Sequence, residues 1–299
     1  MDLSYVHCEL CPRRCGVDRT KKTGYCGGGD SAAVAETMLH MWEEPCISGT
    51  LGSGAVFFSG CNLRCSFCQN RDISRAVTGD SMTADRLADE FRALVKRGAH
   101  NINLVTATPY LPTVVCALGN FKKTDPLVTV VYNTGGYERT EAIAALDGLV
   151  DVYLPDFKYF DGNLAAEYSA APDYPSVVIS AIDEMTERVG EIVIENGLVK
   201  RGVIIRHLVL PGHRDDSIAV LRTIADRWEN KVKVSIMRQF TPEFASEDCD
   251  LKRRVTSFEY SEILREAEKL GLDGYSQDRA SASADYTPNF IKSIIVKNQ

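Results

Sequence analysis

The chain has 299 residues, of which 44% are hydrophobic and 25% charged, a balance typical of globular proteins rather than disordered, collagenous or membrane proteins. Its formal net charge is −7, so nucleic acid is a weak expectation that would need a local basic patch such as Lys252–Arg254. The N-terminus lacks the apolar core of a signal peptide and no run approaches the ~18 apolar residues of a membrane span. We therefore expect a cytoplasmic protein with no membrane partner.

From about residue 55 onward, short apolar runs alternate with helical segments, the pattern of βα units on a parallel sheet. The expected strands are Ala55–Ser59, Asn101–Thr106, Leu127–Asn133, Asp151–Pro155, Val203–Leu210 and Val232–Met237. The expected helices are Ala84–Arg97, capped by Thr83, and Thr140–Leu146, Ser176–Val189, Ser217–Trp228 and Phe258–Leu270. The Asn196-Gly197 pair within Glu191–Val199 predicts a small inserted hairpin. The sequence thus favours an α/β barrel.

We expect three segments: a cysteine-rich N-terminal extension over residues 1–50, the barrel over residues 51–275, and a C-terminal tail over residues 276–299. In an α/β barrel, the loops at the carboxyl ends of the strands carry the functional site. The first expected strand runs directly into Cys61. Chemistry is therefore expected in this cysteine loop.

Three of the ten cysteines, Cys61, Cys65 and Cys68, share this loop in a C-x3-C-x2-C pattern. Ten cysteines in a reducing compartment indicate metal ligation or catalysis rather than disulfides. Three thiolates on one loop can reach three corners of a cubane cluster and leave the fourth iron without a protein ligand. A zinc ion would need a fourth ligand from elsewhere, and three packed structural thiols are the remaining alternative.

A second cysteine group lies near the start of the chain, in a C-x2-C-x3-C-x10-C pattern formed by Cys8, Cys11, Cys15 and Cys26. Four thiolates are enough to close a tetrahedral zinc site or to hold an auxiliary iron–sulfur cluster, and the spacing does not decide between them. A metal-free set of buried or redox-sensitive thiols is the third alternative. We expect the scattered Cys46, Cys116 and Cys249 to be packed thiols.

The segment Cys61-Asn-Leu-Arg-Cys65-Ser-Phe67-Cys68 resembles the C-x3-C-x-aromatic-C signature of the radical SAM superfamily. The resemblance implies that the three cysteines hold a [4Fe-4S] cluster, that S-adenosylmethionine (SAM) chelates its open iron, and that Phe67 lies near the adenine. It also implies a partial (β/α)6 barrel of TIM type. Further motifs resemble PflX-type proteins, which are similar to the pyruvate formate-lyase activating enzyme: WEEPCISG at Trp42–Gly49, YNTGGYE at Tyr132–Glu138, LPDFKYFD at Leu154–Asp161 and IRHLVLPGH at Ile205–His213.

The resemblance to the activating enzymes assigns SAM contacts position by position. The assigned residues are Asn133 and Thr134 after the third strand, Asp156 and Lys158 after the fourth, Arg206 in the fifth, and, by position only, Thr106 and Thr108. These residue types suit SAM, because its hydroxyls and ammonium need oxygen acceptors and its carboxylate needs a cation. The alternative is that Asp156 and Lys158 form a solvated pair and Arg206 lies on the surface.

The sequence departs from the activating enzymes at two places. Their T-H-Y stretch is Thr108-Pro109-Tyr110 here, and no histidine follows the sixth expected strand. We therefore expect a locally different SAM geometry. Four residues that follow strands are candidate substrate contacts: Tyr110, Tyr137, Glu138 and Gln239. His207 and His213, which flank the fifth strand, are expected to be hydrogen-bonded structural histidines.

The leading functional hypothesis is a radical SAM oxidoreductase that cleaves SAM reductively and abstracts hydrogen from a small molecule, peptide, protein or RNA. Its expected partner is a low-potential electron donor of flavodoxin or ferredoxin type. One alternative is an activase that generates a glycyl radical on a partner protein. Another is a non-catalytic iron–sulfur or zinc protein, which would have no use for an open iron at the mouth of a barrel.

Overall fold

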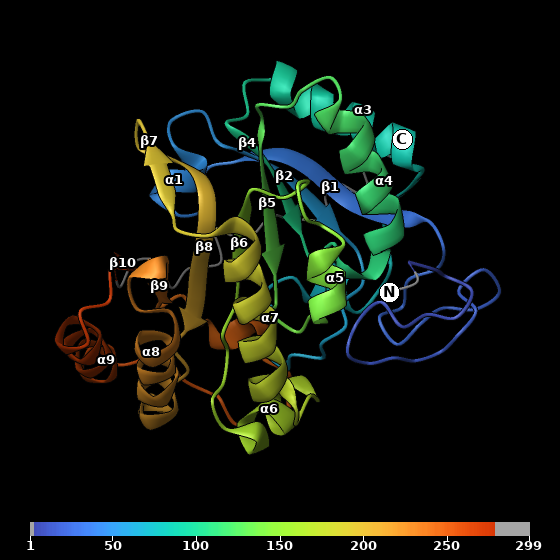
Figure 1. Cartoon of the computed structure of the whole chain (residues 1–299). Helices are drawn as coiled ribbons and strands as arrows, with labels where there is room; N and C mark the ends of the chain where they lie inside the picture. Colours follow the sequence, from blue (N-terminus) through green and yellow to red (C-terminus); the bar gives the residue numbers. More distant parts are fainter. Residues whose placement is uncertain (1–2, 279–299) are drawn as a thin grey trace.

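The computed structural model describes residues 3–278 and shows one curved, mostly parallel sheet with helices around its outside (Figure 1). The strands are β1 (Ala32–His40), β2 (Ser53–Phe58), β3 (Asp80–Met82), β4 (Asn101–Val105), β5 (Thr129–Thr134), β6 (Val152–Pro155), β7 (Val193–Glu195), β8 (Leu198–Leu208), β9 (Val232–Met237) and β10 (Gly274–Ser276). The helices are α1 (Pro45–Ser48), α2 (Arg71–Ser74), α3 (Ala84–Lys96), α4 (Leu111–Lys122), α5 (Thr140–Ala144), α6 (Gly162–Ser169), α7 (Tyr174–Val189), α8 (Arg214–Trp228) and α9 (Ser257–Lys269).

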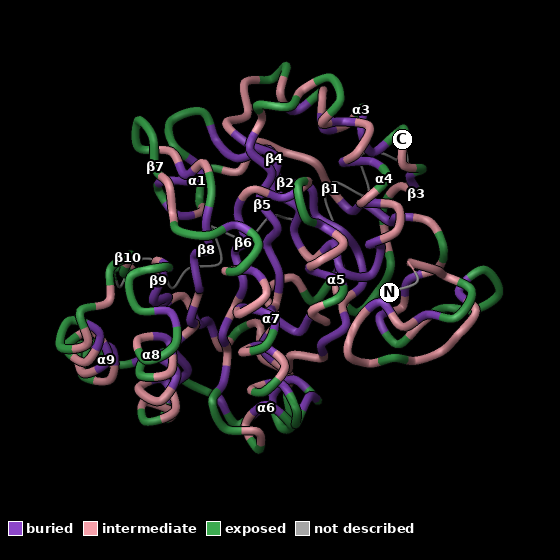
Figure 2. The backbone as a smooth tube through the Cα atoms, viewed as in Figure 1, coloured by how far each residue is buried: buried purple, intermediate pink, exposed green. Residues whose placement is uncertain are grey.

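The parallel strands confirm the predicted fold class. Their order is β10-β9-β8-β6-β5-β4-β2, and all six expected strands pair in parallel. Because the strands are covered on both faces, they are buried almost throughout, whereas the helices expose one side (Figure 2). The sheet stays open, so the structure is a partial barrel.

Two antiparallel strands extend the sheet beyond β2. Strand β1 pairs with β2 through Val34 to His40, and β3 pairs with β1. The sequence analysis did not predict either strand. It also assigned residues 1–50 to the extension, whereas β1 is an integral strand of the sheet. Its first four residues, Ala32–Ala35, are all buried, so the segment shows none of the alternation that marks a half-exposed strand.

The inserted hairpin is confirmed. Strand β7 pairs antiparallel with the start of β8, with Glu195 opposite Leu198. Asn196 and Gly197 form the turn with φ values of 52° and 79°, the left-handed conformation that a two-residue hairpin turn requires. The second hairpin strand continues into the sheet, so β8 begins five residues earlier than predicted.

Residues 3–31 form the N-terminal arm, which contains no helix or strand. It packs on the side of α4 and α5 (Figure 1): Tyr5 Oη lies 2.8 Å from Thr113 Oγ1, and Arg139 donates to the Glu9 carbonyl. The predicted C-terminal tail lies almost wholly outside the described residues. No helix in residues 3–278 has both the length and the apolar character needed to cross a membrane.

Candidate active site

One large cavity opens where the parallel strands end. Its volume is about 390 Å³. The lining side chains from the cysteine loop and the strand ends are Cys61, Leu63, Cys65, Phe67, Cys68, Thr106, Asn133, Thr134, Asp156, Lys158, Arg206, Met237 and Gln239. This is the location at which an α/β barrel carries its chemistry. The structure thus brings together the loop cysteines and all but one of the predicted SAM contacts.

The cysteine loop leaves β2 through a turn that only glycine accommodates well. Gly60 has a φ of 85°, and a Cβ at this position would lie 2.6 Å from the Cys26 carbonyl oxygen. The loop then passes beneath α6, where Ser66 N donates to the Tyr168 carbonyl. These contacts fix a segment that would otherwise be mobile, and they seat the loop directly against the N-terminal arm.

The three loop cysteines are partly buried and line the large cavity together. Burial, followed by the neighbouring Cys65, raises the pKa of both Cys61 and Cys68. The loop also supplies hydrogen bonds to sulfur: Leu63 N lies 3.4 Å from Cys61 Sγ, and Ser74 Oγ lies 3.5 Å from Cys68 Sγ. A cationic group bound here would favour the thiolate form of these cysteines.

These thiols fit a cluster better than a single ion. Across the described residues, no three His, Cys, Asp or Glu side chains are arranged to hold one metal ion. In a cubane each thiolate binds a different iron, so the sulfurs need not converge on one point. Cys61, Cys65 and Cys68 would hold three irons of such a cluster, and the cavity would leave the fourth accessible.

A buried ion network lies beside the thiols. Asp156 follows β6, and its carboxylate accepts from Lys158 Nζ at 2.6 Å and from Arg206 Nε at 3.0 Å. Arg206 Nη2 also donates to Asn133 Oδ1 at 2.6 Å. The three charged side chains are only 14–15% exposed. The alternative of a solvated surface pair with a surface arginine is therefore wrong.

The charge states of this network are strongly fixed. Burial raises the pKa of Asp156, but Arg206 and Lys158 outweigh it, so that this pKa lies below its usual range. Burial lowers the pKa of Lys158, but Asp156 outweighs it and the pKa is raised. The network therefore presents one carboxylate and two cations to the cavity at any physiological pH.

Phe67 and Thr106 also line the cavity. Phe67 is buried and packs edge-on against Phe240 and Tyr168, with ring centroids 5.9 Å and 6.4 Å away. Thr106, directly after β4, has a φ of 61°, and its amide donates to the Asn133 carbonyl. A β-branched residue in the left-handed region is strained, and such strain concentrates at functional sites.

Thr108 does not line this cavity. Its hydroxyl donates to the buried carboxylate of Glu138, which also accepts from Thr134. Burial raises the pKa of Glu138 to about 7. Thr108 instead borders a second, small cavity formed with the N-terminal arm. It therefore reaches the SAM contacts only indirectly, through Glu138 and Thr134.

Of the four candidate substrate contacts, only Gln239 lines the large cavity. Tyr110 is fully buried, and Tyr137 is 2% exposed and donates to Asp173. Glu138 is held by two threonines. The interpretation of these three as substrate contacts is wrong, because a side chain that follows a strand can point into the packing beside the barrel as well as into its mouth.

The two histidines are structural, as predicted. His207 is buried between the Phe157 carbonyl at 2.8 Å and Ser217 Oγ at 2.9 Å. Burial lowers its pKa to about 4, so the ring stays neutral. His213 Nε2 lies 3.0 Å from Tyr168 Oη.

Three cavity residues were missed by the sequence analysis. His40, the last residue of β1, lines the cavity together with Glu43 and Glu44 in the segment that follows. Glu43 Oε2 lies 3.5 Å from Arg206 Nη1, and His40 Nδ1 lies 3.4 Å from Glu43 Oε1. Burial raises the pKa of Glu44, whose Oε2 has no hydrogen-bond partner among the described residues. The adjacent acidic pair was quoted only as part of the WEEPCISG motif.

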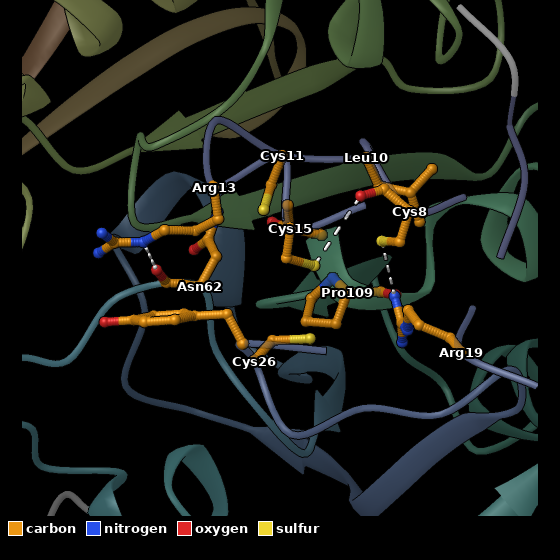
Figure 3. Close-up of a pocket in the computed structure, with 11 residues that line it drawn as sticks. Cys8, Leu10, Cys11, Arg13, Cys15, Arg19, Cys26, Asn62 and Pro109 are labelled. Atoms are coloured by element: carbon orange, nitrogen blue, oxygen red, sulfur yellow. Dashed lines mark hydrogen bonds between the residues drawn. The ribbon is translucent and has the colours of Figure 1, made fainter. Parts of the chain in front are cut away.

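The four arm cysteines surround the small cavity (Figure 3). Cys8 and Cys26 are buried, and Cys11 and Cys15 are partly so. Of the scattered cysteines, Cys46 and Cys249 are buried as expected, whereas Cys116 on α4 is exposed. The expectation of a packed thiol at Cys116 is therefore wrong, because this position lies on the outer face of the helix.

Comparison with curated proteins gives two relatives. An uncharacterised protein of Methanocaldococcus jannaschii is 30% identical over 276 residues, which cover 90% of this chain and 76% of the relative. The 7-carboxy-7-deazaguanine synthase of Methanothermobacter thermautotrophicus is 27% identical over 150 residues, which cover 50% of this chain and 56% of that enzyme.

Solved structures give a similar fold at low sequence identity. SuiB of Streptococcus suis, bound to the precursor peptide SuiA, matches with a TM-score of 0.54 and 12% identity over 73% of this chain and 46% of that protein. A radical SAM methyltransferase from Sphaerobacter thermophilus matches with a TM-score of 0.53 and 16% identity, over 75% of this chain and 66% of the methyltransferase. The chain thus spans about half the length of SuiB. These two likenesses show the fold alone.

The model of the Radical SAM superfamily matches residues 55–224, more than half of the chain. The match begins in β2, ends in α8, and contains the cysteine loop together with the ion network. The chain belongs to the radical SAM superfamily, whose members are enzymes that use a [4Fe-4S] cluster and SAM.

Proposed function

We propose that this protein is a radical SAM oxidoreductase of the PflX type, which cleaves SAM reductively and abstracts hydrogen from a substrate in the large cavity. The observation that carries the proposal is that Cys61, Cys65 and Cys68 share one cavity with the buried network of Asp156, Lys158, Arg206 and Asn133. When bound, the cluster and SAM supply one-electron cleavage to methionine and a 5′-deoxyadenosyl radical. A low-potential donor of flavodoxin or ferredoxin type would provide the electron.

The chain's own contribution is orientation. Lys158 and Arg206 carry the positive charges that would bind the carboxylate of SAM. Asp156 would accept from a hydroxyl or ammonium group, because a carboxylate offers about four acceptor sites and only two are taken by Lys158 and Arg206. Phe67, held by its aromatic neighbours, offers a rigid apolar surface next to the cysteines. A mostly buried site of this kind limits the access of water to a reactive radical.

The substrate would occupy the remaining wall of the cavity. Glu44 and Gln239 line this wall and lie outside the ion network. We therefore place the substrate against these two side chains, where an unpartnered carboxyl oxygen can accept a hydrogen bond.

The test is anaerobic reconstitution with iron and sulfide, followed by electron-spin resonance with and without SAM and an assay for 5′-deoxyadenosine after reduction. We expect a cluster signal that changes with SAM, and deoxyadenosine formation. Replacing Cys65 by Ala should abolish both results, because two thiolates no longer hold the loop cluster.

The matched control is Cys116→Ala, because this thiol is exposed on α4 and lies outside both cavities. It should leave the SAM-sensitive signal unchanged. Deoxyadenosine formation by Cys65→Ala would refute the proposal. An activase role, as a finer alternative, would require a glycyl-radical signal that appears only when a partner protein is added.

A further inference from the structure

The four cysteines of the N-terminal arm border a single small cavity. The space between the residues that line it is small. Figure 3 shows the thiols of Cys8, Cys11, Cys15 and Cys26 arranged around this space. The cysteines come from a compact loop, because Gly16 N donates to the Cys8 carbonyl and Gly24 N to the Gly28 carbonyl. A chain without helix or strand thus gathers four thiols from 19 residues of sequence.

The cavity also contains two guanidinium groups that lack anionic partners. Arg19 is 2% exposed and donates to the Gly28 and Pro109 carbonyls at 3.0 Å and 2.5 Å. Its Nη1 lies 3.7 Å from Cys8 Sγ. Within residues 3–278, no carboxylate pairs with Arg19 or with Arg13, and Arg13 Nη2 has no hydrogen-bond partner. The buried Arg19 guanidinium favours a group of net negative charge in this cavity.

A metal centre held by four thiolates supplies that charge. A [4Fe-4S] core of charge +2 with four thiolates carries a net charge of about −2, and the Arg19 guanidinium beside Cys8 offsets part of it. A zinc ion gives the same sum, so charge alone does not identify the metal. The arrangement of the thiols does separate the two cases.

The arm thiols do not converge on one point. No set of three ligands in the described part of the chain could hold a single ion, and this includes both the arm cysteines and the loop cysteines. The loop belongs to a superfamily that binds a cubane. The first three arm cysteines repeat its spacing in reverse order, C-x2-C-x3-C against C-x3-C-x2-C. The arm thus has four thiol ligands, three of them in a spacing related to that of the loop.

The arm cavity adjoins the cysteine loop. Arg13 Nε donates to the carbonyl of Asn62, the residue after Cys61, at 2.8 Å. The Tyr25 ring lies between Arg13 and Arg64, whose Cζ atoms are 4.4 Å and 4.8 Å from its centroid. Asn62 itself lines the arm cavity, and its neighbour Cys61 lines the large one. A purely structural metal ion does not have to lie next to the cysteine loop. A redox centre that passes electrons to the loop does.

We propose that Cys8, Cys11, Cys15 and Cys26 ligate a second [4Fe-4S] cluster, which relays electrons to the cysteine loop. The arm cluster takes one electron from a low-potential one-electron donor protein and passes that electron to the loop site, so it returns to its oxidised state with no net change. That the loop site accepts the electron rests on the proposed function. The presence of the arm cluster does not.

The first test counts iron, sulfide and zinc after anaerobic reconstitution. The wild-type chain should contain about eight irons, and about four should remain in the loop variant Cys61→Ala/Cys65→Ala/Cys68→Ala or in the arm variant Cys8→Ala/Cys11→Ala. The loop variant should keep a reduced-cluster spin signal that SAM does not alter. Cys116→Ala, the control, should retain all the iron.

Three results would overturn the arm cluster: one zinc per chain with about four irons, about two irons in the loop variant, or a loop variant free of iron. The loop variant keeps the arm sequence intact, so misfolding of the arm variant does not affect this measurement. If the wild type forms no deoxyadenosine while the loop variant holds a SAM-insensitive cluster, the proposed function fails and the arm cluster stands.

The second test addresses the relay. The arm variant should lose SAM cleavage driven by a reduced flavodoxin while it keeps cleavage driven by dithionite, a small reductant that can reach the loop directly. If the arm variant keeps the same fraction of the wild-type rate with flavodoxin as with dithionite, the relay is refuted. Circular dichroism of the arm variant would show whether its fold is retained.

Discussion

Asp156 is the residue on which the polar half of the active site depends. It is the shared anion for Lys158 and Arg206, so its removal takes the carboxylate partner from Lys158 and leaves Arg206 with only the longer contact to Glu43. We predict that Asp156→Asn weakens SAM binding by about tenfold or more, measured by titration of the reconstituted protein. Asp226→Asn changes an exposed carboxylate on α8 and should bind SAM as the wild type does. Equal affinities in the two variants would contradict this role.

His207 makes folding stability depend on pH. Its pKa is lowered by burial from 6.5 to about 4 in the folded chain, so the unfolded chain binds a proton first as pH falls. The contribution of His207 to the free energy of unfolding is complete above the pKa of this histidine in the unfolded chain. It is lost as pH falls toward 4, by about 1.4 kcal/mol per pH unit. Urea unfolding of the metal-free chain at about pH 7 and about pH 5 should show this loss. His207→Gln should show a smaller pH dependence, and an unchanged one would contradict the assignment.

At the scale of elements, the turn after β5 packs closely against the backbone of Asp156, a member of the ion network. Gly136 has a φ of 79°, and a Cβ there would lie 2.2 Å from the Asp156 carbonyl oxygen. We predict that Gly136→Ala displaces the segment after β6 and weakens SAM binding. Gly148→Ala also changes a glycine of positive φ, 69°, but meets no atom within 4 Å. This variant should lower the free energy of unfolding only through backbone strain, by about 1 kcal/mol. It should leave SAM affinity unaltered.

Elements with a clear apolar period were predictable from sequence, and others were not. Helix α4 was missed although its buried residues, Leu111, Val114, Ala117, Leu118 and Phe121, follow a helical spacing. Pro112, paired β-branched valines and Gly119 lower the helix propensity of this segment. Strand β1 begins with a wholly buried, alanine-rich run, which resembles neither an amphipathic strand nor a long helix.

The parts of the site formed by residues close together in the sequence were predictable. The cysteine loop and the Asp156–Lys158 pair each occupy a few consecutive residues, so their spacing is visible in one stretch. Glu43 and Glu44 enter the cavity because β1 runs antiparallel to β2 and brings the following segment to the amino-terminal end of β2, where His40 pairs with Ser53. No local pattern contains that information, because it depends on strand pairing across the fold.

At the scale of the molecule, SAM would touch residues from the cysteine loop and from several neighbouring strands. Binding to such a site stabilises the whole folded state by mass action, by about 2.7 kcal/mol at 100 times the dissociation constant. We predict that SAM raises the thermal midpoint of the cluster-loaded protein by several degrees. The Asp156→Asn variant should show a smaller rise, measured by anaerobic calorimetry. No rise in the wild type would contradict SAM binding to the folded chain.

Tyr25 belongs to the arm, yet its ring is covered by one arginine from the arm and one from the cysteine loop. Each side of this sandwich is complete only when the other is correctly folded. Whatever stabilises the arm must therefore favour the loop conformation by a certain free energy, and whatever stabilises the loop must favour the arm by the same amount. Loading of the two cysteine sites is then cooperative and reciprocal, so partially filled chains should be scarce at intermediate iron supply.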